Sequence, residues 1–149
     1  PINWSVQQVT QFLRVLHRLP QLNVKWSTIG AESTIKAGSS EASIKVDLAL
    51  DPCIGGERPK FAYTPRFPKA KQEGWWVVLG SAETGELHAL RRVTIPISRK
   101  PNGNSNNTSV TLSFTPPPWP GKVTYSLYIM SDSYFGINQQ YQVQLDITQ

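Results

Sequence analysis

Side chains able to carry out chemistry are few in this sequence and lie far apart. His17 and His88 fall in a predicted helix and a predicted strand, so they share neither a metal-ligand spacing nor a catalytic-triad partner. Cys53 has no histidine or cationic neighbour in sequence to activate its thiol. Asp51 and Asp132 stand in loops, but calcium sites need several clustered carboxylates. Phosphate-binding glycine loops and serine elbows are missing as well. We therefore predict no catalytic residue, metal site or cofactor, and no enzyme activity in this chain alone.

Positive charge is concentrated in the middle of the chain. The formal net charge is +5, and residues 57–100 contain nine basic residues against four acidic ones. Such a patch could follow the phosphates of a nucleic acid, with Lys69, Lys71, Arg91 and Arg92 as candidate contacts. The alternative is an ordinary solvated face, because no recognition helix or run of basic residues turns this charge into a motif.

Two adjacent tryptophans, Trp75 and Trp76, occupy a run that otherwise has the composition of a strand. Successive side chains of a strand point to opposite faces. The alternation places Trp75 inward as a core anchor and Trp76 outward with Val78. In residues 122–130 the outward positions become apolar at Tyr128 and Met130. We predict that Trp76, Val78, Tyr128 and Met130 form one protein-docking face, unless a helix or loop of the same domain covers it.

The elements that must position these residues are one helix and a series of short strands. Residues 5–17 predict the helix, with Ser5 and Gln8 as a capping box, and Pro20 ends it. The remainder has strand patterns, at residues 22–28, 42–50, 75–81, 86–95, 109–114, 122–130 and 140–148. These indicate an all-β, seven-stranded immunoglobulin-like sandwich, with Tyr125 as a core residue in the position of a tyrosine corner. A β-barrel is the competing all-β fold.

Length and composition limit the class of protein to which this chain can belong. At 149 residues, the chain is long enough for one domain with a substantial core. We expect residues 1–20 to be a lead-in helix from an absent upstream domain and residues 21–149 to be the β-sandwich. With Cys53 as the single cysteine, no intramolecular disulfide can form, which favours an intracellular location. No apolar run approaches the roughly 18 residues of a membrane span, so no membrane partner is expected.

Several motifs resemble the end of the second cassette of the large tandem-cassette superfamily 2 helicases. They are "EGWW" followed by "VLG" (73–80), "YSLYIMSDSYFG" (125–136) and "QQYQVQLDITQ" (139–149), and the resemblance spans nearly the whole chain. The "SDSYFGINQQY" and "DITQ" forms look closer to the helicase subunit of the activating signal cointegrator 1 complex than to the spliceosomal U5 helicase. An Asn-rich insertion at 102–107 departs from both patterns.

The resemblance implies an immunoglobulin-like domain at the carboxyl end of the helicase, with ATP binding and strand separation in domains absent here. The implied role is a non-catalytic structural and protein-interaction module that contacts upstream helicase domains and other subunits. In the cointegrator branch, the parent would act in alkylation-damage DNA repair and ribosome quality control, in the nucleus or the cytoplasm. The alternatives are a nucleic-acid-contacting module using residues 57–100, or the equivalent domain of the U5 helicase.

Overall fold

The computed structural model describes residues 3–29, 35–51, 59–97 and 106–149. One helix is followed by eight strands in this part of the chain. Their bounds are α1 Val6–Leu16, β1 Leu22–Ile29, β2 Ile35–Lys36, β3 Ala42–Leu50, β4 Trp75–Gly80, β5 Leu87–Val93, β6 Asn107–Phe114, β7 Gly121–Ser131 and β8 Gln139–Thr148.

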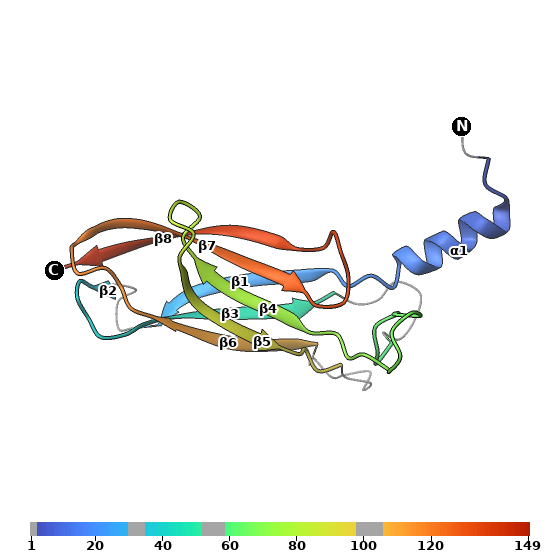
Figure 1. The fold of residues 1–149 in the computed structure, drawn as a ribbon, viewed down its shortest axis with the longest axis horizontal. Coiled ribbons are helices and arrows are strands. Elements are labelled where there is room, and N and C mark those ends of the chain that lie inside the picture. The colour runs from blue at the N-terminus through green and yellow to red at the C-terminus, as the bar shows by residue number, and fades with distance from the viewer. Residues whose placement is uncertain (1–2, 30–34, 52–58, 98–105) are drawn as a thin grey trace.

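Helix α1 begins as the sequence predicts. Ser5 is the N-cap, and its hydroxyl accepts a hydrogen bond from the Gln8 backbone N–H at 3.3 Å. The Gln8 side chain in turn accepts from the Ser5 N–H at 2.8 Å, which completes the capping box. No residue of α1 is buried, and the helix extends away from the sheets (Figure 1). Its apolar stripe is therefore uncovered by the part of the chain that the structure describes.

The strands form two sheets. One sheet has the order β1-β3-β6, and the other has the order β2-β8-β7-β4-β5. Every pair is antiparallel except β2 with β8. At one side of the molecule β5 contacts β6 of the other sheet, so the two sheets close together there (Figure 1). Gly85 has a φ of +70° in the turn between β4 and β5, where the Ser81 N–H donates to the Glu86 carbonyl at 2.9 Å.

The all-β architecture with one preceding helix is confirmed, whereas the count of seven strands is wrong for the described residues. All seven predicted strands are present, and β2 adds an eighth by pairing in parallel with the end of β8. A two-residue strand has no periodicity to detect, so only the tertiary pairing of Ile35 with Ile147 reveals it.

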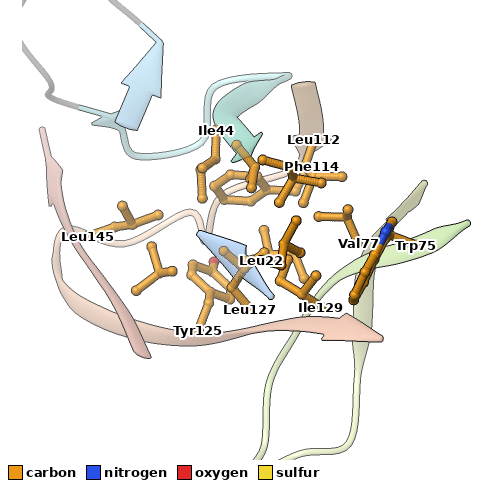
Figure 2. Packing of buried hydrophobic residues seen from close by; sticks show 14 of the residues in the cluster. Leu22, Ile44, Trp75, Val77, Leu112, Phe114, Tyr125, Leu127, Ile129 and Leu145 are labelled. Atoms are coloured by element: carbon orange, nitrogen blue, oxygen red, sulfur yellow. The ribbon is translucent and has the colours of Figure 1, made fainter. Parts of the chain in front are cut away.

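The hydrophobic core lies between the sheets. Ile44, Val46 and Leu48 of β3 are fully buried, and so are Leu127 and Ile129 of β7. Side chains from both sheets meet in this layer, with Trp75 and Val77 of β4 at one end and Leu145 of β8 at the other (Figure 2). Because successive side chains of a strand point to opposite faces, each sheet buries one face in the core and leaves its other face for solvent or partners.

Candidate protein-docking face

The four residues predicted to share a face lie on two adjacent strands. Trp76 of β4 is the register partner of Met130 of β7, and Val78 is the partner of Tyr128. Directly opposed side chains in an antiparallel pair have Cβ atoms about 4.5–5.5 Å apart. The pairing therefore brings Trp76, Val78, Tyr128 and Met130 together as a two-by-two block on the side of the sheet away from the core. We call these four residues, together with Leu90 of β5, the outer face.

Strand β5 extends the block by one apolar residue that sequence reasoning missed. Leu90 pairs with Val78 and is 47% exposed, while Trp76 is 37% exposed. Val78, Tyr128 and Met130 are half-buried. On the far side, Gln140 of β8 pairs with Tyr128 and donates from its side-chain nitrogen to the Tyr128 hydroxyl at 3.2 Å. A contiguous apolar strip thus runs across β5, β4 and β7 and ends at a polar strand.

The two predicted core anchors lie on the opposite face of the same sheet. Trp75 is 1% exposed and Tyr125 is 3% exposed. The Tyr125 ring packs edge-on against Phe114 at 5.2 Å and against His88 at 4.9 Å between centroids. Burial raises the pKa of the Tyr125 hydroxyl, and the nearby Glu86 carboxylate raises it further. The His88 ring thus packs against a core residue.

Asp132, just after β7, joins several residues at the edge of the outer face through hydrogen bonds and ion pairs. Its carboxylate accepts from the Arg92 Nε at 3.0 Å and Nη2 at 2.5 Å, from the Gly74 N–H at 3.0 Å and from the Ser133 hydroxyl at 2.7 Å. The Lys71 ammonium lies 3.5 Å from the same carboxylate. Burial alone would raise the Asp132 pKa, but the bonds from Ser133, Arg92 and Gly74 and the charge of Lys71 together lower it. We call this arrangement the Asp132 latch.

Gly74 packs closely against the side chains of the latch. A Cβ atom built on Gly74 would lie 2.5 Å from the Asp132 Oδ2 atom and would also overlap the Arg92 guanidinium. A larger residue at position 74 would therefore require the Asp132 or Arg92 side chain to shift from its place in the latch.

The four predicted basic contacts do not form one free patch. Lys71 and Arg92 direct their charges at Asp132. Arg91 and Arg92 are consecutive on β5 and therefore point to opposite faces of the sheet. Lys69 and Arg91 are exposed, and no ion pair joins either of them to another residue within the described ranges. The sequence indicated where basic residues concentrate but could not show which ones an acid neutralises.

Cys53 lies outside the described residues, and so does most of the insertion at 102–107, of which only Asn106 and Asn107 are described. Among the residues described, no cluster of three or more metal-ligand side chains is present. The described helix is too short and too polar to cross a bilayer.

Comparison with known proteins gives one family. Residues 4–144 match the family described as the Sec63 Brl domain. The Arabidopsis thaliana DExH-box ATP-dependent RNA helicase DExH12 is 32% identical over 98% of this chain and 6% of its own length. Human activating signal cointegrator 1 complex subunit 3 is 45% identical over 63% of this chain and 4% of its own length. The Drosophila melanogaster U5 small nuclear ribonucleoprotein 200 kDa helicase is 32% identical over 94% of this chain and 6% of its own length.

The match covers most of the chain, while the chain spans only a small fraction of each of these relatives. The predicted resemblance of this chain to the cointegrator helicase subunit and to the U5 helicase is thereby confirmed. The chain belongs to the Sec63 Brl domain family and is homologous to the accessory domains that these helicases carry.

Proposed function

We propose that this domain is a non-catalytic docking module of a large ATP-dependent helicase, and that its outer face contacts other parts of the same helicase polypeptide. The observation that carries the proposal is the apolar strip of Leu90, Val78 and Tyr128 with Trp76 and Met130 beside it, left uncovered by the described chain. Apolar patches of this kind mark interfaces, and aromatic residues and methionine are enriched at them.

The Asp132 latch supports the same proposal. A charged residue at the edge of an apolar docking face must either be neutralised or be desolvated on binding, and an unpaired buried charge is costly. Arg92 pairs with Trp76 across the strands and already holds Asp132. The edge of the outer face therefore presents a satisfied ion pair rather than a free charge.

Site-specific photo-crosslinking in the full-length parent helicase tests this proposal. We expect p-benzoylphenylalanine in place of Trp76 to crosslink to protein segments outside these 149 residues. Trp26, on β1 of the other sheet, is the matched control because it is also 37% exposed. Crosslinks to segments of the helicase at position 76 and none at position 26 would support docking. Equal yields at both positions, or none at 76, would contradict it.

We also propose an immunoglobulin-like sandwich, because the orders β1-β3-β6 and β8-β7-β4-β5 match the A-B-E and G-F-C-C′ arrangement of such domains. The similarity to the human cointegrator subunit supports a parent of that kind. For such a parent we propose the roles that the sequence resemblance implies, in DNA repair and ribosome quality control, within the nucleus or cytoplasm. The similarity to the Drosophila U5 helicase supports a spliceosomal parent instead. Affinity purification of the tagged parent followed by mass spectrometry separates these: cointegrator subunits should co-purify in the first case, and U5 proteins in the second.

A further inference from the structure

A second surface lies in the connection 59–74 between β3 and β4. Three aromatic side chains of this segment stand out into solvent: Phe61, Tyr63 and Phe67 are 44%, 60% and 54% exposed. Basic residues alternate with them along the chain, and Lys60, Arg66 and Lys69 are all exposed. Exposed rings interleaved with cations are the composition of surfaces on which bases stack while phosphates are neutralised.

Hydrogen bonds hold the backbone of this connection in place. The Ala62 N–H donates to the Lys71 carbonyl at 2.8 Å, and the Tyr63 N–H donates to the Tyr134 hydroxyl at 2.9 Å. The Phe67 N–H closes a turn on the Thr64 carbonyl at 3.0 Å. The rings are therefore presented from a fixed backbone, which lowers the entropy lost when a ligand binds.

The C-terminal end of helix α1 and the turn after it supply further cations to the same surface. Arg14 lies in the last turn of α1, and Arg18 lies in the turn that follows the helix, where its N–H donates to the Val15 carbonyl at 3.0 Å. Together with Tyr63 and Tyr134 they line a pocket of about 330 Å³ between α1 and the connection. Both arginines are exposed, and neither forms an ion pair with any residue that the structure describes.

We propose that Tyr63, Arg14 and Arg18, flanked by Phe61 and Phe67, bind single-stranded nucleic acid. The rings offer stacking faces to unpaired bases, and the two guanidinium groups offer paired donors to phosphate oxygens. The nearby acids do not compete for these cations, because Glu73 is only 8% exposed and Asp132 is held by Arg92 and Lys71. This surface does not include Arg91 or Arg92 and is separate from the outer face. The test of nucleic-acid binding is therefore independent of the docking proposal.

Fluorescence anisotropy of a 12-nucleotide oligouridylate added to the 149-residue chain tests the proposal. We expect binding whose log Kd rises with log salt, with a slope that decreases by about 1.4 when Arg14→Glu and Arg18→Glu remove two phosphate contacts. Tyr63→Ala should weaken binding about tenfold, while Tyr63→Phe should keep it within about twofold, because the ring rather than the hydroxyl stacks.

Matched controls come from elsewhere on the molecule. Trp119→Ala removes a ring that is 64% exposed in the β6–β7 connection, at the end remote from α1 (Figure 1). Lys25→Glu with Lys122→Glu makes the same charge change as the arginine pair, at two exposed strand residues. Neither control should change the affinity by more than about threefold, and circular dichroism melts should show every variant folded.

Three results would overturn the proposal. One is an absence of oligouridylate binding at 50 mM salt. Another is a loss of affinity in the two controls that equals the loss in Tyr63→Ala and the arginine pair. The third is equally tight binding of double-stranded RNA or of polyglutamate, since stacking requires unpaired bases and polyglutamate offers charge alone.

Discussion

The inner and outer faces of β4 carry the same residue type with different consequences. Trp75 is buried among Val77, Leu79 and the residues of the facing sheet, whereas Trp76 lies on the other side and remains 37% exposed. Their difference in environment comes from the two-residue period of the strand alone. The comparison teaches that an aromatic pair in a strand can serve two roles: one ring contributes to folding, and the other is left for binding.

The largest expected effect is the loss of stability when Trp75, the buried tryptophan of the pair, is truncated. Trp75→Ala should lower the free energy of unfolding by about 3–5 kcal/mol, because it removes a large buried side chain and leaves a cavity. Urea denaturation followed by circular dichroism measures the loss. A loss below about 1 kcal/mol would show that Trp75 is not a core residue.

The next effect concerns the Asp132 latch, at the junction of the two faces. Asp132→Ala should cost about 1–3 kcal/mol at neutral pH, since it removes a mostly buried acceptor of several hydrogen bonds. Arg92 is partly exposed, so solvent screening keeps the cost below that of a fully buried pair. Asp47→Ala is the control: Asp47 is an exposed carboxylate whose pKa is also lowered, chiefly by its bond from Ser109 and by Lys45, and should cost less than about 1 kcal/mol.

The latch also predicts a pH dependence. Because folding lowers the Asp132 pKa, the unfolded state binds protons more readily, so stability decreases as pH falls. The contribution is complete above the unfolded value of about 3.9 and is lost as pH falls from there through the lower folded pKa. The difference in unfolding free energy between the wild type and Asp132→Ala should therefore be constant between pH 5 and 8 and shrink below about pH 4. A difference that grew as the pH fell would contradict the latch.

On the outer side the expected change in stability is smaller. Trp76→Ala should cost less than half of the Trp75→Ala loss, because its ring is partly exposed and its cross-strand neighbours are only Met130 and Arg92. Thermal melts of the two variants measured side by side decide this. Equal decreases in Tm would mean that the outer face is part of the core.

The smallest effect is expected in α1. Phe12 is 45% exposed and contacts Trp4 edge-on at 4.9 Å, and no residue of this helix is buried. Phe12→Ala should therefore change the free energy of unfolding of the sheets by less than about 0.5 kcal/mol. A loss above 1 kcal/mol in a urea titration would indicate that the helix packs on the sandwich in solution.

Local patterns explain how much of this structure the sequence could predict. Helix α1 and the register of outward residues on β4 and β7 follow from periods of 3.6 and 2, which are written in consecutive residues. Leu90 was missed because β5 is an edge strand without clean alternation, with a burial pattern that is mostly exposed. The latch joins residues 71, 74, 92 and 132, and such long-range pairing leaves no local signal.

The central claim is that Trp76 is the centre of a docking face. The most direct measurement is isothermal titration calorimetry of this chain against the parent helicase lacking this domain, with wild type, Trp76→Ala and Trp26→Ala compared. The account predicts that Trp76→Ala weakens binding tenfold or more, as truncation of a central interface tryptophan does, while Trp26→Ala stays within about twofold. Equal affinity of wild type and Trp76→Ala, or an equal loss in Trp26→Ala, would contradict it.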